Sequence, residues 1–479
     1  MTTETIRTCD VVVIGAGPVG ENVADRTAAA GLSTVIVESE LAGGECSYWA
    51  CDPSKALLRP VLLHADAARV PGLGPAAEGP LDVKAVLAHR DRMASGWNDE
   101  GQAEWIASAG IELLRGHGRL TGVREVAVTT PGGEVVRLRA RHAVAVCTGS
   151  AAALPDLPGL AALRPWTSRE ATSAQEVPLR LVVVGGGVVG VEMATAWQGL
   201  GSQVTLLARG ERLLPRMEPF ASDLVAEGLR EAGVDVRLGT YATAAWRTAH
   251  GEVRAITSDG AELTADEILF ATGRVPRSAD VGLETVDLTP GDWLGVDDSL
   301  TVTAVPGDWL YAAGDVNGRA LYTHQGKYQA RIAGSVIAAR ARGEAPDTRR
   351  WSPHRATADT VAVPGVVFTA PEVASVGLTA HEAERAGRDV QVVDYDMGQV
   401  AGALQYRPDY RGRARILIDR ERRTVVGATF AGPGVAELLH AATLAITGEI
   451  PVERLWHAVP AFPTISEVWL RLLETGCRS

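Results

Sequence analysis

The chain is poor in cysteine, in lysine and in long apolar runs, and each shortage excludes a class of protein. Five cysteines in 479 residues are too few for a disulfide scaffold. No run reaches the ~18 apolar residues of a membrane span, and no apolar stretch precedes the first expected strand. The formal net charge of −12 leaves no basic face for a polyanion. We therefore expect a cytoplasmic protein that binds neither nucleic acid nor a membrane.

The composition that remains is typical of a packed α/β protein. Hydrophobic residues make up 46% and charged residues 22%, with 52 glycines along the whole length. At 479 residues the chain is too long for one hydrophobic core and long enough for about three domains of ordinary size.

A duplicated segment organises the chain. VVVIGAGPVGENVADRTAAAGLSTVIVES at 11–39 recurs without a gap as LVVVGGGVVGVEMATAWQGLGSQVTLLAR at 181–209. Each copy runs from an apolar strand through Gly-x-Gly-x-x-Gly into an Ala-rich helix and a second strand, the order of a nucleotide-binding βαβ unit. Such glycines allow a tight turn, a close approach to a pyrophosphate and close helix packing. The two motifs predict two bound dinucleotides, and their glycines are Gly15, Gly17 and Gly20, then Gly185, Gly187 and Gly190.

The copies differ where the second strand ends. Glu38 ends the first copy, where a carboxylate accepts hydrogen bonds from a ribose diol. Ala208 holds that position in the second copy and is followed by Arg209 and Arg212, so the acid that would repel a 2′-phosphate is absent and cations are near. This favours NADPH over NADH there. The alternative is that these arginines only face water.

Three further apolar strands end in glycine motifs. VAVCTGS contains Gly149, ILFATGRVP contains Gly273, and WLYAAGDVNG contains Gly314 and Asp315. Strand ends of this kind lie at the ligand-binding edge of a parallel sheet. After residue 351 short strands and helices replace the βαβ pattern, so a further domain is expected to begin there.

Cys46 and Cys51 are the notable pair, in GGECSYWACDPSK. A zinc site needs about four ligands, and no second Cys or His pair at ligand spacing accompanies them. We therefore expect no metal. Pro53 suits a first helical turn, which places Cys51 at a helix N-terminus, where the helix dipole stabilises a thiolate. A reactive pair is indicated, and two inert buried thiols are the alternative.

In combination these motifs resemble the flavoprotein disulfide reductases, the family of dihydrolipoamide dehydrogenase, glutathione reductase and mercuric reductase. The resemblance covers nearly the whole chain and includes VVFTAPEVASVGLT and PTISE near the C-terminus. It implies an α/β homodimer with two Rossmann-like domains, for FAD and NADPH, and a C-terminal α+β dimerisation domain. The expected bounds are FAD-binding parts at 1–150 and 276–350, a nicotinamide domain at 151–275 and a dimerisation domain at 351–479.

The resemblance also implies roles for single residues. Cys46 and Cys51 would form the redox-active disulfide, with Cys46 exchanging with the acceptor and Cys51 lying against the flavin. Lys55 would pair near flavin N5 with Glu192, and Asp315 would contact the ribityl and pyrophosphate region of FAD. An exposed lysine and a turn aspartate are the alternatives for Lys55 and Asp315.

One part of the pattern is broken. Family members that reduce disulfides carry a His-Pro dipeptide whose His is a general acid-base from the partner subunit, held by a Glu. Here Phe462 replaces that His, whereas Glu467 remains. His457 or Tyr48 would be the substitutes for the acid, and Tyr48 and Trp49 lie between the cysteines, where they would offer stacking surfaces.

The sequence thus predicts an enzyme, an NADPH-dependent FAD oxidoreductase that passes electrons through the Cys46–Cys51 disulfide to a small acceptor. One alternative is a quinone or metal-ion reductase that works at the flavin. Another is a slow, redox-sensing flavoprotein.

Overall fold

The computed structural model describes residues 6–77 and 79–478, so residues 1–5, 78 and 479 of the expected first and last domains lie outside the described residues. The chain folds into two units, and each is assembled from three separate segments. The first unit comprises residues 1–52, 91–151 and 274–360, and the second comprises residues 53–90, 152–273 and 361–479.

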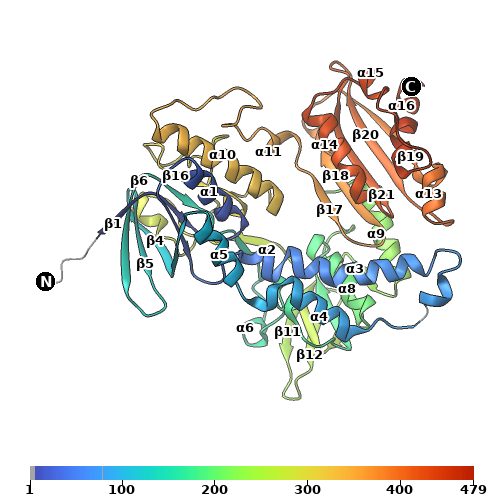
Figure 1. Ribbon diagram of the computed structural model, residues 1–479. Helices are drawn as coiled ribbons and strands as arrows, with labels where there is room; N and C mark the ends of the chain where they lie inside the picture. The colour runs from blue at the N-terminus through green and yellow to red at the C-terminus, as the bar shows by residue number, and fades with distance from the viewer. Residues whose placement is uncertain (1–5, 78, 479) are drawn as a thin grey trace. The chain divides into compact units, whose positions relative to one another are not determined.

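A seven-stranded sheet forms the centre of the first unit (Figure 1). Strands β3, β2, β1 and β6 run parallel, and β6 pairs with antiparallel β5 through its first half and with parallel β16 through its last three residues. The strands are β1 Ile6–Ile14, β2 Thr34–Glu38, β3 Glu112–Arg115, β4 His117–Gly122, β5 Glu125–Thr129, β6 Val135–Val146 and β16 Leu310–Ala312.

Two long helices of the first unit, α1 and α10, pack side by side (Figure 1). Strand β1 contributes the consecutive buried valines Val11, Val12 and Val13 to the core, as expected of a parallel strand that is covered on both faces. The helices of this unit are α1 Pro18–Ala29, α2 Gly44–Trp49, α5 Glu100–Ser108 and α10 Thr323–Ala341. Strands β7 Ser150–Ala152 and β15 Arg274–Pro276 form a separate pair.

The second unit contains three sheets. Its parallel sheet has the order β10-β9-β8-β14, an antiparallel sheet has the order β11-β12-β13, and a five-stranded antiparallel sheet has the order β17-β18-β21-β20-β19. The strands are β8 Arg180–Val184, β9 Gln203–Ala208, β10 Asp235–Leu238, β11 Ala242–Arg247, β12 Val253–Thr257, β13 Glu262–Ala265, β14 Glu267–Phe270, β17 Gly365–Val367, β18 Glu372–Gly377, β19 Val390–Asp396, β20 Arg413–Asp419 and β21 Val425–Gly432.

Helices cover these sheets. Helix α3 starts at the end of a first-unit segment, and α11 Ala358–Val361 ends where the last segment of the second unit begins. Of the helices that remain, α3, α4, α8, α9 and α16 are long and the others are short. The bounds are α3 Cys51–Ala67, α4 Val83–Met93, α6 Leu160–Leu163, α7 Ser168–Ser173, α8 Val188–Gly199, α9 Pro219–Glu231, α12 Ala380–Arg385, α13 Ala401–Tyr406, α14 Leu439–Thr447, α15 Val452–Leu455 and α16 Val468–Arg478.

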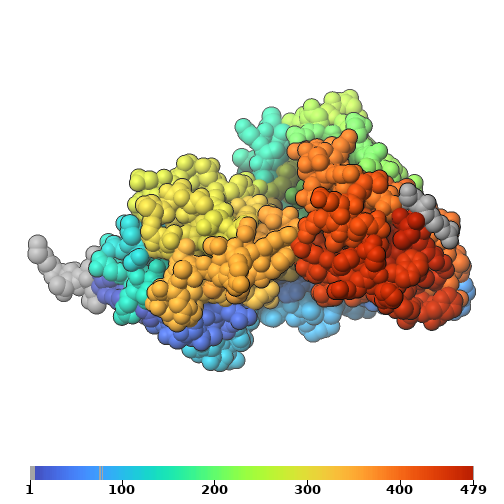
Figure 2. All heavy atoms as spheres, turned by 90° about the horizontal axis from the view of Figure 1, so that it is seen from above, coloured from blue at the N-terminus to red at the C-terminus, as the bar shows by residue number. Residues whose placement is uncertain are grey.

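The segment after residue 361 has a hydrophobic core of its own. One cluster of buried side chains draws all its members from residues 362–473, with Phe430, Ile416 and Leu472 fully buried within it. In Figure 2 this segment, coloured orange to red, forms one continuous block. Three further buried residues of this segment, Val367, Val373 and Ala431, belong instead to a cluster shared with earlier parts of the second unit.

The sequence-based expectation of an α/β fold is confirmed. Both expected βαβ segments form, as β1-α1-β2 and β8-α8-β9 with parallel strands. No helix of the described chain combines the length and the apolar character that crossing a membrane needs.

Candidate active site

The glycine motifs of the first unit meet at one edge of its sheet. Strands β1 and β16 both run parallel to β6, so their carboxyl ends lie together. A Cβ atom on Gly15 would lie 2.6 Å from the carbonyl oxygen of Cys147, two residues before Gly149. A Cβ atom on Gly314 would lie 2.9 Å from the side chain of Val19 in the first turn of α1. The structure thus brings Gly15, Gly149 and Gly314 to one place.

Close helix packing explains the third glycine of each fingerprint. A Cβ atom on Gly20 would lie 1.8 Å from the carbonyl oxygen of Gly15, and one on Gly190 would lie 1.8 Å from that of Gly185. No side chain fits at such a distance. The two fingerprints therefore have the same local geometry, as their shared sequence predicts.

The first fingerprint leaves bare backbone where a pyrophosphate would bind. Gly17 is the N-cap of α1, and Gly44 faces it so closely that a Cβ atom on Gly44 would lie 2.7 Å from the Cα atom of Gly17. Within the described residues the hydroxyl of Thr148 is buried without a hydrogen-bond partner. Bare backbone, a helix N-terminus and a spare hydroxyl fit a dinucleotide such as FAD.

Glu38 lies beside this turn. Its Oε2 atom accepts a hydrogen bond from the backbone N–H of Ala16 at 2.7 Å, and its Oε1 atom accepts one from the N–H of Glu40 at 2.8 Å. The carboxylate is therefore held at the end of β2, next to the second residue of the fingerprint. This is the position from which an acid reaches a ribose diol.

Asp315 is tied to the start of β7 through Ser150. The hydroxyl of Ser150 donates to Oδ2 of Asp315 at 2.5 Å, and the guanidinium of Arg274 donates to that hydroxyl at 2.5 Å. Burial raises the pKa of Asp315, although the hydrogen bond from Ser150 acts against the rise. Arg274 directly follows the Ala-Thr-Gly motif. Its position beside that motif could have identified it as a candidate site residue.

The expected nucleotide residues of the second unit also meet. A Cβ atom on Gly185 would lie 2.2 Å from the carbonyl oxygen of Ala271, two residues before Gly273, and one on Gly186 would lie 2.9 Å from Cβ of Ala208. Gly187 is the N-cap of α8 and has open space around its Cα atom. Ala208 is buried and Arg209, which follows it, is exposed.

Lys55 and Glu192 form an ion pair in the second unit. Nζ of Lys55 donates to Oε2 of Glu192 at 2.8 Å, and the backbone N–H of Phe368 donates to Oε1 at 3.0 Å. Nζ also lies 5.0 Å from the centre of the Phe368 ring. The side chain of Glu192 is 4% exposed and that of Lys55 is 39% exposed, so the carboxylate is fixed while the ammonium group reaches solvent. The pairing expected from the resemblance is present.

Cys46 and Cys51 lie together. Cys46 is on α2, Cys51 begins α3 as the position of Pro53 predicts, and neither is in a disulfide in this structure. The hydroxyl of Thr323, at the start of α10, lies 3.3 Å from the Cys51 sulfur. The hydrogen bond with Cys51 and then burial raise the pKa of Cys46 well above its ordinary value. In residues 6–77 and 79–478 no three His, Cys, Asp or Glu side chains are grouped so as to hold a metal ion.

Helix α2 is anchored by Tyr48, which corrects one expectation. The Tyr48 side chain is 3% exposed, its hydroxyl donates to the carbonyl of Ala42 at 2.8 Å, and burial raises its pKa to about 12. The indole N–H of Trp97 donates to the carbonyl of Tyr48 at 3.1 Å. Tyr48 is therefore neither a stacking surface nor an available acid, because its ring is buried and its hydroxyl proton is bound by a backbone carbonyl.

Glu45, next to Cys46, is paired with a residue that belongs to no motif of the sequence. Nη2 of Arg277 lies 3.1 Å from Glu45, and Nη1 of the same guanidinium lies 3.4 Å from Glu40. Arg277 follows β15, so it connects α2 to a distant part of the first unit. The charge of Glu45 beside the cysteine is thereby balanced.

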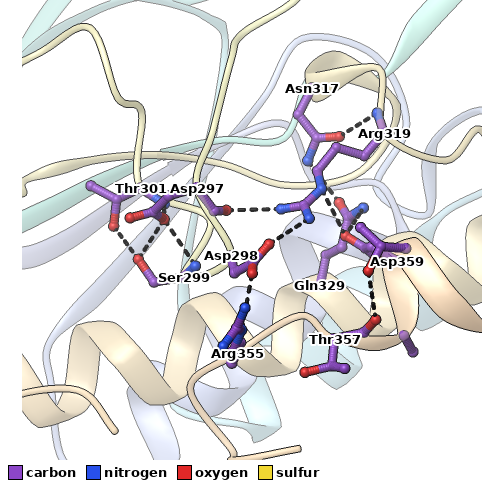
Figure 3. A network of polar contacts seen from close by, with 12 residues as sticks. Asp297, Asp298, Ser299, Thr301, Asn317, Arg319, Gln329, Arg355, Thr357 and Asp359 are labelled. Atoms are coloured by element: carbon purple, nitrogen blue, oxygen red, sulfur yellow. Dashed lines mark hydrogen bonds and ion pairs between the residues drawn. The ribbon is translucent and has the colours of Figure 1, made fainter. Parts of the chain in front are cut away.

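A polar network holds the start of α10 and the Gly314 turn (Figure 3). The side chain of Gln329 accepts from the backbone N–H of Gly314 at 2.8 Å and donates to Asp359 at 3.0 Å. Asp359 also accepts from Gln325 at 2.6 Å and lies 3.3 Å from the guanidinium of Arg319. Apart from Gly314, these residues stood in no recognisable motif, because their partners are more than ten residues away and only the fold brings them together.

Glu467 lies in the second unit, not in the unit of the cysteine pair. Its Oε1 atom accepts from Arg471 at 2.6 Å. Its Oε2 atom is buried and, within the described residues, has no hydrogen-bond partner. Phe462, the residue that replaces the expected His, has a side chain that is 75% exposed.

Comparisons with protein families agree with this arrangement. The sequence model described as pyridine nucleotide-disulphide oxidoreductase matches residues 9–343, and the one described as the dimerisation domain of the same proteins matches residues 363–472.

Individual proteins match over almost the whole chain. A dihydrolipoyl dehydrogenase of Thermus scotoductus is 33% identical over 98% of this chain and 97% of its own. A mercuric reductase of Staphylococcus aureus is 27% identical over 96% of this chain and 80% of its own. Among solved structures, the Cu(II) complex of the HOCl-induced flavoprotein disulfide reductase RclA from Escherichia coli has a TM-score of 0.83 at 23% identity, covering 98% of this chain and 99% of its own. That last likeness supports the fold.

Proposed function

Because the chain belongs to the pyridine nucleotide-disulphide oxidoreductase family, we propose that it passes electrons from NADPH through FAD and the Cys46–Cys51 pair to a small acceptor. The observation that carries the proposal is the pair itself. Cys46 lies on α2 and Cys51 begins α3, both in the unit that also gathers Gly15, Gly149 and Gly314.

FAD, when bound, accepts a hydride from the nicotinamide and delivers two electrons to the disulfide. The chain's own task is to hold and orient the groups. We assign the pyrophosphate of FAD to the bare backbone at Gly17 and Gly44, and its ribose to Glu38. By the family resemblance, Lys55, which is paired with Glu192, would supply a positive charge to the flavin.

NADPH, rather than NADH, is the proposed donor. The strand end after the second fingerprint holds no carboxylate at Ala208, and Arg209 and Arg212 are exposed beside it. A guanidinium suits a 2′-phosphate because it offers several parallel N–H donors.

We further propose a cytoplasmic homodimer with the four domain bounds given above. The dimerisation domain at 363–472 and the exposed apolar side chains of Trp456 and Val459 support the dimer. None of the five cysteines forms a disulfide, which suits a reducing compartment.

A second candidate is reduction of quinones or metal ions at the flavin. It is favoured by Phe462, because a phenyl ring cannot protonate a departing thiolate and quinones need no such step. Its 75% exposed ring offers a surface on which a planar acceptor can stack.

The proposal is tested by the oxidation of NADPH. Purified protein, reconstituted with FAD, is mixed with small disulfides, quinones and Hg(II) in separate assays, and each is repeated with Cys46→Ser. Loss of turnover in the variant for the best acceptor supports the dithiol route. Unchanged turnover supports the second candidate, and a protein that is folded but takes up no FAD contradicts both.

A further inference from the structure

Lysine is so rare in this chain that each lysine is informative. Only three of its 46 Lys and Arg residues are lysines, namely Lys55, Lys84 and Lys327. Arginine serves wherever a fixed positive charge is enough, but a guanidinium does not release its proton in proteins, whereas an amine does. Lys55 is bound to Glu192 and Lys84 is exposed on α4. Lys327 is on α10, which also contacts the cysteine pair.

Helical spacing places Lys327 on the face of α10 that meets the cysteines. The hydroxyl of Thr323 lies 3.3 Å from the Cys51 sulfur. Residues four apart lie one above the other on a helix, so Lys327 occupies the same face one turn further on. The side chain of Lys327 is exposed, so its flexible stem can carry the ammonium group toward the pair.

Electrostatics place the ammonium group near the pair as well. Burial raises the pKa of Asp52, which directly follows Cys51, and the positive charge of Lys327 acts against that rise. The same charge acts on Glu21 in α1. Asp52 in turn contributes to the raised pKa of Cys46. Lys327 therefore lies within electrostatic range of Asp52, whose charge in turn affects the pKa of Cys46.

The other groups around the pair are less suited to proton exchange. Tyr48 donates its proton to a backbone carbonyl and its pKa is raised to about 12. Glu45 is paired with Arg277. His324 follows Thr323 directly, about 100° further round the helix, and its ring stacks on Tyr322 at a centroid distance of 5.2 Å.

We propose that Lys327 exchanges protons with the Cys46–Cys51 pair. In this way it performs the task of the histidine that Phe462 replaces in this chain. The inference rests on the proposed function. It names a residue of this chain that the motifs of the family do not include.

With a disulfide as the acceptor, the proposed step conserves electrons, protons and bonds. A hydride equivalent, which carries two electrons and one proton, reduces the Cys46–Cys51 disulfide to one thiol and one thiolate. Cys46 sulfur attacks one acceptor sulfur, the acceptor S–S bond breaks, and the departing thiolate takes a proton from the Lys327 ammonium group. Cys51 sulfur then attacks Cys46, which re-forms the disulfide and releases the second acceptor sulfur with the proton of the original thiol. The amine regains a proton from water.

The test compares Lys327→Gln, Lys327→Arg, His324→Gln and the control Lys84→Gln, all in a Cys477→Ser background that removes an exposed thiol. Two measurements are made on holoenzyme reduced with NADPH. One is the pH dependence of alkylation of Cys46 by iodoacetamide, followed by mass spectrometry of the peptide. The other is the rate of reoxidation by hydroxyethyl disulfide in a single turnover.

Lys327→Gln is expected to move the alkylation midpoint up by half a pH unit or more and to slow reoxidation by a factor of about 10 to 100, within the usual contribution of a general acid. Lys327→Arg is expected to keep the midpoint, because the charge remains, and to stay slow, because the guanidinium keeps its proton. Lys84→Gln is expected to behave as the parent does.

Parent-like reoxidation in Lys327→Gln overturns the inference, as does full recovery in Lys327→Arg, which would leave Lys327 only a fixed charge. A loss confined to His324→Gln overturns it in favour of that imidazole. If NADPH does not reduce the pair in the parent, the proposed function fails instead, and alkylation after chemical reduction with dithiothreitol still reports on Lys327.

Discussion

Replacing Phe462 by histidine should give this protein back an acid-base group for which the carboxylate partner is already present. Within the described residues Oε2 of Glu467 is buried and has no hydrogen-bond partner, whereas Oε1 is bound by Arg471. An unsatisfied buried acceptor costs roughly 1–3 kcal/mol, so an imidazole N–H that reaches Oε2 is bound favourably. Phe462 is five residues before Glu467 and 75% exposed, so its replacement disrupts no core packing.

The size of the expected gain follows from the chemistry of the leaving thiolate. A positioned acid contributes typically 10²–10⁴ in rate. Lys327, if it exchanges protons with the pair, already supplies a part of this. We therefore expect Phe462→His to raise kcat/KM for a small disulfide about 10- to 100-fold, which corresponds to about 1.4–2.7 kcal/mol of transition-state stabilisation. Quinone reduction should not improve.

The assay is NADPH-driven reduction of lipoamide and of a benzoquinone between pH 5 and 9. Phe462→Ala is the matched control, since it removes the ring without adding an imidazole, and Phe462→His combined with Glu467→Gln removes the carboxylate. The gain should follow a group with a pKa near the ordinary histidine value of about 6.5. Equal rates for Phe462→His and Phe462→Ala at every pH, or a gain that survives Glu467→Gln, would refute the reasoning.

Three further predictions concern the nucleotide, the cysteines and a buried acid. Arg209→Ala should raise KM for NADPH far more than KM for NADH, because the lost charged contact is worth roughly 1.5–3 kcal/mol; a parent that uses NADH equally well contradicts this. After anaerobic reduction with NADPH the parent should show a long-wavelength thiolate-to-flavin absorbance that Cys51→Ser abolishes and Cys46→Ser retains, and an unchanged band in Cys51→Ser means that the roles are wrongly assigned. Burial raises the pKa of Glu21 to about 7, although the hydrogen bond from Gln102 acts against the rise. The folded chain thus binds this proton more tightly than the unfolded chain, and the stability from this group, complete below about pH 4.5, is lost as the pH rises through 7. Glu21→Gln should increase the free energy of unfolding at pH 8 by about 1–3 kcal/mol and leave it nearly unchanged at pH 4.5, as measured by urea denaturation; no difference between the two pH values counts against the buried charge.

The parts of the fold that sequence predicts best are those that depend on local geometry. The glycines of both fingerprints follow from the contact between neighbouring turns, because Gly20 and Gly190 leave no room for a Cβ atom. The start of α3 follows from Pro53, which suits a first helical turn. Such features are encoded within about ten residues and need no knowledge of the distant chain.

The parts that sequence does not predict depend on contacts between distant segments. Thr323 lies 3.3 Å from the Cys51 sulfur although 272 positions separate them, and Arg277 pairs with Glu45 across 232 positions. Tyr48 was misjudged for a related reason. Its position between the cysteines gives no sign of its contacts with Ala42 and Trp97, and Trp97 lies 49 positions further along the chain.

The duplicated segment also shows where specificity resides in this architecture. Both copies place their third glycine at the same distance from the first, 1.8 Å from a would-be Cβ atom to the carbonyl oxygen, and both begin their helix after a glycine N-cap. The turn therefore has the same geometry in both copies. What differs is the end of the second strand, where Glu38 is held by the N–H of Ala16 in one copy and the exposed Arg209 follows Ala208 in the other. With the turns as the proposed phosphate sites, the strand ends are left to choose the nucleotide, so exchanging the strand-end residues is expected to alter which nucleotide binds without disturbing the fold.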